Sequence, residues 1–277
     1  MPAHIYTRPG MKTATRMAHI ACAIAIVFAA GALLPSWSAH AASMVDAIAR
    51  VKPSVVAIGT LMKTRSPSIV FIATGFVVGA GRHVVTNAHA VDRALDTEHM
   101  ERRVVLVARG DDTQARSAEI LAIDKEHDLA VLGIAGDPLP ALKLGDSDGV
   151  REGEMMAFTG FPIGMVLGFH PSTHRGMVAA ITPVALPGIT AQQLNARMIA
   201  RIRTSAYKVF QLDGTAYPGN SGSPLYDPET GAVLGIVNSV FVQGTRESAI
   251  GHPSGITYAI PSRYIRDLLQ SANVPGF

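Results

Sequence analysis

The stretch "YPGNSGSPLYDPETGAVLGI", Tyr217 to Ile236, starts with a loop and continues into two apolar runs. Pro, Gly, Asn and Ser dominate the loop, a composition typical of turns. The runs that follow, "SPLYD" and "AVLGIVNSVF", have the length and residue types of β-strands. The stretch therefore predicts a tight turn leading into strands. It also raises the question of whether Ser221 or Ser223 does chemistry.

Similar short strand-like runs recur along most of the chain. They are "SVVAIGTLM", "SIVFIATGFVV", "HVVTNA", "RVVLVAR", "AEILAID" and "LAVLGI", then, after a turn-rich link, "MMAFTGF", "GMVAAITPV", "KVFQLD", "SPLYD", "AVLGIVNSVF" and "ITYAI". Many short strands with few helices between them predict an all-β protein. The link divides the chain into two units, residues 42–145 and 146–277, each expected to form a small barrel.

Three segments have helical patterns. Ser43 is a good N-cap for a short helix in "SMVDAIARV". "SRYIRDLLQSA" has apolar residues at helical spacing, which predicts a C-terminal helix packed on the second unit. "TAQQLNARMIARIR", residues 190–203, reads as a helix-like insertion in that unit.

The first 41 residues resemble a secretory signal peptide. Three basic residues precede an uncharged apolar run, and Ala39 and Ala41 have the spacing of a cleavage site. We expect cleavage after Ala41 and export to the periplasm or the extracellular space, without stable membrane insertion. The alternative is an uncleaved anchor, because Met17 to Leu34 has nearly the length of a spanning helix.

Removal of the leader changes the charge. The chain has 24 basic and 21 acidic residues, and three of the basic ones lie in the leader, so the remainder is balanced. This balance argues against nucleic-acid binding. The only Cys also lies in the leader, so the mature chain has no disulfide and depends on core packing.

Two residues in the first unit are candidates for acid–base chemistry. His89, in "VVTNAHAV", follows an apolar strand and has small neighbours that leave the imidazole room to face a cleft. Asp128 directly precedes the run Leu129 to Ile134, where a carboxylate at a strand edge could orient a histidine. Each alone is more often a packing or turn residue.

The loop of the opening stretch supplies a candidate nucleophile. Gly219 and Gly222 flank Ser221, which allows a sharp bend with backbone N–H groups aimed at a developing oxyanion. With His89 and Asp128, the chain then has a base, an orienting acid and a nucleophile in the order His, Asp, Ser, one of the known orders of the serine-protease triad. The site would lie between the two units.

The blocks "TGFVVGAGRHVVTNAHAV", "HDLAVL", "LGDSDGVREGE", "GMVAA", "YPGNSGSPLYDPETGAVLGI" and "GITYAIPSRYI" resemble the protease domain of HtrA-type, trypsin-like serine proteases. The resemblance runs from about residue 50 to 270. It implies two six-stranded β-barrels of the chymotrypsin fold with a short N-terminal and a C-terminal helix. It also implies polypeptide substrates, among them unfolded or misfolded proteins, and no cofactor.

The resemblance implies roles for individual residues as well. His89 matches the general base, Asp128 the orienting carboxylate and Ser221 the nucleophile. The turn of Gly219, Asn220 and Ser221 matches the oxyanion hole. A substrate pocket is expected from the remaining matches, Ala216, Ile236, Val237 and Asn238, which favours uncharged, small to medium apolar side chains before the cleaved bond.

The sequence also departs from the family. Ser223 stands where the family usually has Gly. Glutamyl endopeptidases of the same fold also have Ser at this position, but they carry a histidine where this chain has Val237, which argues against cleavage after Glu. We expect no PDZ domain after the predicted C-terminal helix, so the resemblance does not imply regulation through such a domain or trimer formation. Asn220 replaces the Asp that pairs with a new N-terminus in trypsin-type zymogens, which argues against activation by clipping.

Other functions fit the sequence less well. An α/β-hydrolase esterase would need G-x-S-x-G, and Ser223 breaks that pattern. His170 and His174 in "HPSTH" lack the glutamate of a zincin, so no metal site is expected. The main alternative is a catalytically idle relative that binds proteins. The oligomeric state and the natural substrate are not readable from the sequence.

Overall fold

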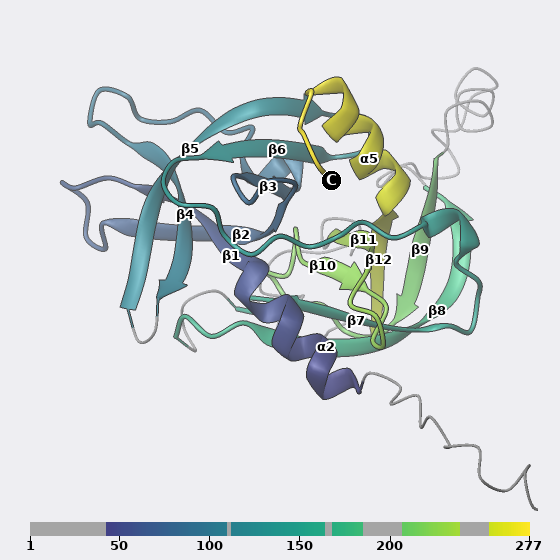
Figure 1. Ribbon diagram of the computed structural model, residues 1–277. Helices are drawn as coiled ribbons and strands as arrows, with labels where there is room; N and C mark the ends of the chain where they lie inside the picture. Colours follow the sequence, from purple (N-terminus) through teal and green to yellow (C-terminus); the bar gives the residue numbers. More distant parts are fainter. Residues whose placement is uncertain (1–42, 110–111, 164–167, 185–206, 239–254) are drawn as a thin grey trace, which may run out of the picture. The chain divides into compact units, whose positions relative to one another are not determined.

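The computed structural model describes residues 43–109, 112–163, 168–184, 207–238 and 255–277. The predicted signal peptide and the predicted insertion at 190–203 lie outside these residues. The described residues form twelve strands, which fall into two groups along the chain (Figure 1). Within the described residues, no helix is long and apolar enough to cross a membrane.

Each group of strands closes into an antiparallel barrel in the order β1-β2-β3-β6-β5-β4 or β10-β11-β12-β9-β8-β7. The first barrel comprises β1 (Val55–Leu61), β2 (Ile69–Val78), β3 (His83–Thr86), β4 (Arg102–Arg109), β5 (Asp112–Asp124) and β6 (Leu129–Ile134). The second comprises β7 (Met155–Gly160), β8 (Ser172–Pro183), β9 (Lys208–Asp213), β10 (Pro224–Tyr226), β11 (Val233–Asn238) and β12 (Ile256–Pro261). The predicted all-β fold with two six-stranded barrels is confirmed.

Two strands are longer than their apolar runs suggested. β5 begins at Asp112, six residues before the predicted run, and its extra residues are mostly polar and mostly exposed. They pair with β4 in a hairpin, for example Ser117 with Val104. β8 begins at Ser172 and pairs with β7 over the added residues. Ladder hydrogen bonds thus extend both strands beyond the part that the hydrophobic pattern marks.

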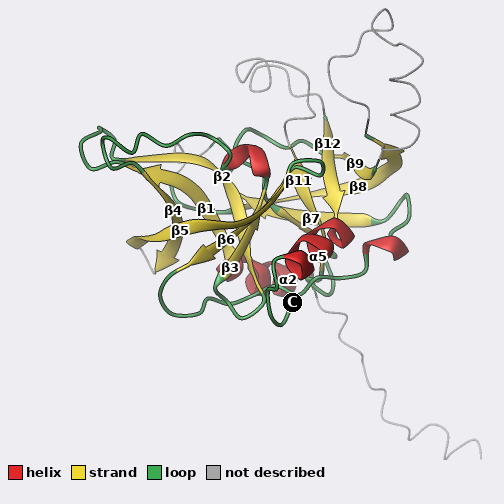
Figure 2. Ribbon diagram, turned by 90° about the horizontal axis from the view of Figure 1, so that it is seen from above, coloured by secondary structure: helices red, strands yellow, loops and turns green. Residues whose placement is uncertain are grey.

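The two predicted terminal helices are present (Figure 2). α2 (Met44–Val51) begins at the N-cap Ser43, whose hydroxyl accepts a hydrogen bond from the Asp46 N–H while the Asp46 carboxylate bonds back to Ser43. Such a reciprocal capping box satisfies backbone donors at the helix start. α5 (Ser262–Ser271) buries Ile265, Leu268 and Leu269. Both predictions are confirmed.

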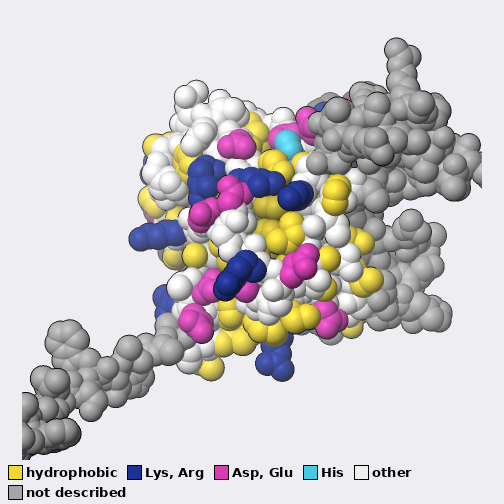
Figure 3. Space-filling view, turned by 90° about the vertical axis from the view of Figure 1, so that its right-hand side faces the viewer, with side chains coloured by type: hydrophobic (Ala, Val, Ile, Leu, Met, Phe, Trp, Pro, Cys, Tyr) yellow, Lys and Arg dark blue, Asp and Glu magenta, His cyan; other side chains and the backbone are white. Residues whose placement is uncertain are grey.

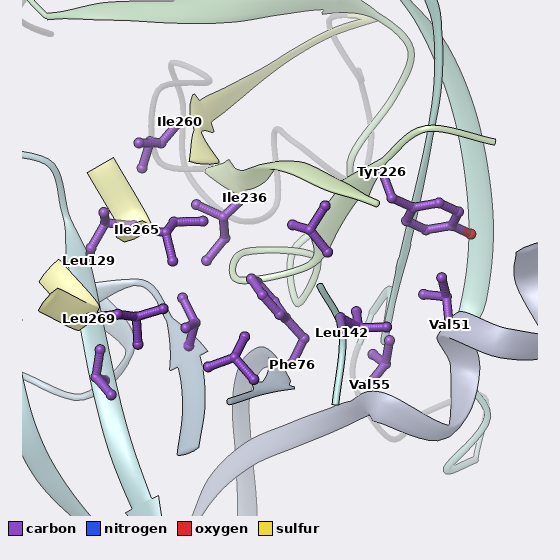
Figure 4. Packing of buried hydrophobic residues seen from close by; sticks show 14 of the residues in the cluster. Val51, Val55, Phe76, Leu129, Leu142, Tyr226, Ile236, Ile260, Ile265 and Leu269 are labelled. Carbon is purple, nitrogen blue, oxygen red and sulfur yellow. The ribbon is translucent and has the colours of Figure 1, made fainter. Parts of the chain in front are cut away.

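The largest hydrophobic cluster contains residues from both barrels and both helices (Figure 4). Phe76 and Leu129 of the first barrel share it with Ile236 of the second and with Ile265 and Leu269 of α5. Each barrel also has its own interior cluster. The shared cluster packs the barrels together, which places the end of β3 and the loop before β10 against one another.

Charged side chains of both signs are intermixed on the face in Figure 3, over apolar and neutral surface. This face carries no single-sign stripe of the kind that tracks a nucleic-acid backbone. The view agrees with the charge balance of the sequence.

Candidate active site

His89 lies just beyond the end of β3. The 3-10 turn Ala88–Ala90 follows that strand and carries the histidine, flanked by the buried residues Ala88 and Ala90. The small neighbours pack into the barrel, while the imidazole keeps 32% of its side-chain surface exposed. The strand therefore presents His89 at the barrel edge, as the sequence predicted.

Asp128 closes the turn between β5 and β6 in a left-handed conformation, with φ of 53°. Asp is among the few residues that tolerate this region. Its carbonyl oxygen accepts hydrogen bonds from the Ala88 N–H, at 3.1 Å, and from the Asn87 side-chain amide, also at 3.1 Å. The backbone of Asp128 is thereby tied to the turn that carries His89.

The Asp128 carboxylate binds His89 through both oxygens. Oδ1 accepts a hydrogen bond from the His89 backbone N–H at 2.8 Å, and Oδ2 lies 2.6 Å from His89 Nδ1. An ionised carboxylate only accepts, so Nδ1 carries the proton. In the neutral ring, Nε2 is then left as the basic nitrogen.

Asn238, at the end of β11, also binds this carboxylate. Its side-chain amide donates to Asp128 Oδ2 at 2.8 Å, across 110 positions of sequence. Asn238 was predicted to line the substrate pocket, and its contact with Asp128 was not foreseen. The sequence carried no signal for the contact, because only the packing of the two barrels brings the strand end to Asp128.

The loop before β10 has the conformation that its glycines suggested. Gly219 and Gly222 have φ values of 101° and 85°, in the left-handed region that favours glycine. A Cβ atom at Gly222 would collide with the Thr74 carbonyl oxygen and would lie 2.7 Å from Thr86 Oγ1. The loop thus lies against β2 of the first barrel, and Ser221 between the glycines retains 4% exposure.

Thr74 of β2 binds this loop at two points and was not recognised from the sequence. Its N–H donates to the Ser221 carbonyl oxygen at 2.8 Å, and its hydroxyl donates to the Gly219 carbonyl oxygen at 2.7 Å. The same hydroxyl accepts from the Phe161 N–H at 3.0 Å. Thr74 is fully buried, so water cannot replace these bonds.

Gly160, at the end of β7, makes room for the side chains of the loop. A Cβ atom there would collide with Ser223 Oγ and would lie 3.0 Å from Asn220 Oδ1. Asn220 and Ser223 are both fully buried. The serine that departs from the family pattern therefore fits because residue 160 has no side chain.

Within the predicted oxyanion-hole turn, the Asn220 N–H donates to the Tyr217 carbonyl oxygen at 2.9 Å. An oxyanion-binding role for the N–H groups of its neighbours, Gly219 and Ser221, stays a prediction.

The predicted pocket residues other than Asn238 lie in or against the barrel interior. Ile236 is fully buried in the shared cluster, and Val237 is fully buried in the interior of the second barrel. Ala216 is partly buried and packs against that same interior. Their role in substrate binding stays a prediction.

The described part of the chain holds no group of three or more His, Cys, Asp or Glu side chains that could bind a metal ion. His174, part of the "HPSTH" motif, lies in β8 with its ring stacked on Phe158 at 5.1 Å between centroids. Burial lowers the pKa of His174, so the ring favours its neutral form.

Comparison with known proteins places this fold and site in a family. The model of the trypsin-like peptidase domain matches residues 73–236, more than half of the chain. The chain therefore belongs to the family of trypsin-like peptidases. The matched segment includes His89, Asp128 and Ser221.

The chain is similar to probable periplasmic DegP-like serine endoproteases. The Halomonas elongata protein is 30% identical over 206 residues, which are 74% of this chain and 36% of that protein. The protein of a Marinomonas strain is 29% identical with the same coverage. The matched region thus spans about a third of the length of these relatives.

Solved structures give the same classification. The HtrA-type protease AlgW with a tripeptide is 26% identical, with a TM-score of 0.56, and the alignment covers 83% of this chain and 63% of that one. The same protease with a decapeptide has a TM-score of 0.61 at 24% identity, covering 83% and 67%. The predicted resemblance to HtrA-type proteases is confirmed.

Proposed function

We propose that this protein is an exported serine endopeptidase that hydrolyses peptide bonds with Ser221, His89 and Asp128. The observation that carries the proposal is the pair of bonds between His89 and the Asp128 carboxylate, one from Nδ1 and one from the backbone N–H. Together they fix the ring orientation and the tautomer, which a histidine needs to act as a general base.

In the proposed reaction, His89 Nε2 takes the proton of the Ser221 hydroxyl as Oγ attacks the carbonyl carbon of the substrate peptide. The N–H groups of Gly219 and Ser221 hold the oxyanion of the tetrahedral intermediate. His89 then donates its proton to the leaving amine, which departs and leaves an acyl ester on Ser221. A water molecule, deprotonated by His89, hydrolyses the ester and restores the enzyme.

Asp128 keeps the imidazolium oriented and stabilises its charge during these steps. Asn238 supports Asp128 with a hydrogen bond to the oxygen that also binds Nδ1. Its role in this account is therefore to orient the triad, beside any contact with substrate. No cofactor takes part in the proposed reaction.

We propose polypeptide substrates with small to medium apolar side chains before the cleaved bond, and the periplasm as the compartment. The names of the DegP-like relatives support the compartment and the class of substrate. The basic, apolar and small-residue parts of residues 1–41 support export and cleavage after Ala41.

The test is a cleavage profile of the purified protein on a library of unstructured peptides, with Ser221→Ala as the matched control. We expect cleavage by the wild type after Ala, Val or similar residues and none by the variant. Cleavage mainly after Arg, Lys or Glu would contradict the pocket assignment. The absence of cleavage by both proteins would favour a relative that binds proteins without catalysis.

A further inference from the structure

His127, directly before Asp128, takes no part in the proposed reaction, yet it is strongly held. Its Nδ1 lies 2.6 Å from Asp124 Oδ2, and its N–H donates to Asp124 Oδ1 at 3.1 Å. Only 19% of its side chain is exposed. Within the turn, Lys125 and Glu126 are exposed. His127 is therefore the anchor of the turn that ends at Asp128.

The ring of His127 contacts two tyrosines from the second half of the chain. It stacks on Tyr264 of α5, with 4.2 Å between centroids and 20° between planes. It meets Tyr207, directly before β9, edge to face at 4.6 Å. The two tyrosine rings contact each other at 5.4 Å. Aromatic contacts of this kind stabilise a structure beyond the effect of the buried area alone.

Both tyrosines are themselves fixed. The Tyr207 carbonyl oxygen accepts a hydrogen bond from the Val184 N–H at 2.9 Å. The Tyr264 hydroxyl accepts from the Arg263 guanidinium at 2.8 Å, and Arg263 also pairs with Asp148 at 2.7 Å. The Tyr207 backbone and the Tyr264 side chain are thus each held by a hydrogen bond beside His127.

Tyr207 also lies close enough to the candidate catalytic group to respond to its charge. Burial is the main cause that raises the pKa of Tyr207, and the carboxylates of Asp128 and Asp124 raise it further. The Tyr207 end of the aromatic cluster therefore lies within electrostatic range of both carboxylates of the turn.

Asp128 has little tolerance for displacement. Its carboxylate must meet His89 and Asn238 together, at 2.6 and 2.8 Å, while its backbone keeps a positive φ. Small displacements of catalytic groups reduce rates strongly. A side chain that holds the preceding residue against the opposite half of the molecule would suppress such movement.

We propose that His127, clamped between Asp124 and the rings of Tyr207 and Tyr264, is a positioning residue that holds Asp128 in place for the His89 base. This inference rests on the proposed function of His89, Asp128 and Ser221. It predicts that loss of the His127 side chain lowers the turnover rate by more than the accompanying increase in unfolded protein explains.

The chain offers a matched control in His99. Its Nδ1 lies 2.8 Å from Asp96 Oδ2 and its N–H donates to Asp96 Oδ1 at 3.1 Å, the geometry of the His127 pair. Its side chain, however, is 62% exposed. His99→Ala removes a histidine–aspartate pair of the same geometry that is not part of the aromatic cluster, and it should leave turnover unchanged.

The kinetic experiment compares wild type, His127→Ala, His127→Phe and His99→Ala on one peptide substrate. For His127→Ala we expect kcat to fall about tenfold with KM within about twofold, because the change affects positioning and not ground-state binding. His127→Phe keeps the ring contacts and should recover to within about threefold of wild type. Tyr264→Leu removes the ring on which His127 stacks and should reproduce the loss of kcat. This variant replaces His127→Ala in the test if His127→Ala does not fold.

Two results would overturn the inference. One is a kcat for His127→Ala equal to that of His99→Ala. The other is a loss of activity that matches the unfolded fraction measured by thermal denaturation, which would indicate a purely structural role. A loss in His127→Phe as large as in His127→Ala would also contradict the ring contacts as the cause.

A second measurement does not depend on catalysis. In a Ser221→Ala background, the proton on His89 Nδ1 in its short hydrogen bond to Asp128 should give a downfield NMR resonance. We expect it to persist in His99→Ala and to shift or broaden in His127→Ala, and an unchanged resonance would overturn the inference. If wild type cleaves no peptide while the resonance responds to His127→Ala, the proposed function fails and the positioning role stands.

Discussion

The hydroxyl of Thr74 donates a 2.7 Å hydrogen bond to the carbonyl oxygen of Gly219, so a strand of the first barrel holds the loop of the second that carries the proposed nucleophile, Ser221. Gly219 and Gly222 in this loop both have positive φ values, and glycine has more conformational freedom than other residues. Thr74 restricts that freedom from across the barrel interface.

Thr74→Val should therefore impair catalysis as well as folding. The substitution keeps the shape of the side chain but leaves the Gly219 carbonyl and the Phe161 N–H without their partner. We expect a loss of about 1–3 kcal/mol in the free energy of unfolding and a fall in kcat of at least about tenfold. Urea denaturation and peptide hydrolysis measure both. Thr74→Ser keeps the hydroxyl and should retain most activity, and an inactive Thr74→Ser would contradict the hydrogen bond as the cause.

Gly222→Ala should be among the most damaging single substitutions. The new Cβ would collide with the Thr74 carbonyl oxygen, and the positive φ is unfavourable for Ala. We expect a destabilisation of more than about 2 kcal/mol and little activity. Gly149→Ala is the control, because no atom lies within 4 Å of a Cβ placed there. Thermal unfolding of the two variants compares them, and equal melting temperatures would contradict this account of the loop.

Asn238→Ala should lower turnover without unfolding the protein. It removes the amide that donates to Asp128 Oδ2, while the two bonds from His89 remain. We expect kcat to fall by about tenfold, less than for loss of a triad member. Asn238→Asp should be more severe, since it places a like charge against Asp128. A kcat for Asn238→Asp at or above that of Asn238→Ala would show that this contact does not orient the triad.

Glu101 should make stability depend on pH. Its side chain is 2% exposed and pairs with Arg65 at 2.8 Å. The pKa of Glu101 is lowered to about 2, mainly by the hydrogen bond from the Asp96 N–H and next by a bond with the Thr60 side chain. Because the pKa of Glu101 is depressed in the folded state, the stabilisation by its ionised carboxylate is fully present above the ordinary pKa of 4.5 and is lost as pH falls toward about 2.

Glu101→Gln tests this directly. The free energies of unfolding of wild type and variant, measured by urea denaturation, should differ most at neutral pH and converge between pH 4.5 and about 2. Arg65 remains in both proteins, so the comparison isolates the charge of Glu101. A constant difference across this range would mean that the carboxylate is not ionised preferentially in the folded state.

Much of the fold could be predicted from the sequence, because its strands alternate with turns and carry β-branched residues. The twelve strand runs and both terminal helices were recognisable in this way. The first half of β5 was not, since Asp112 to Ser117 are mostly polar and mostly exposed and only pairing with β4 makes them a strand. A hydrophobic pattern marks buried segments, and the side chains in this part of β5 are little buried.

The candidate site was predictable to a different degree for each residue. His89, Asp128 and Ser221 occur in recognisable local motifs. Thr74, Asn238 and His127 act through contacts over long sequence separations, and no local pattern marks a Thr in a strand or a His in a turn as part of a site. Only the closure of both barrels and their packing bring these side chains to the triad.

The most direct test of the central claim is to locate the residue labelled by an active-site-directed fluorophosphonate, using peptide mass spectrometry. The account predicts one modified residue, Ser221 and not Ser223, with labelling abolished in Ser221→Ala and reduced by at least about a hundredfold in His89→Ala. Ser223→Gly should label normally. Labelling at Ser223, or labelling of Ser221 that does not depend on His89, would contradict the proposed mechanism.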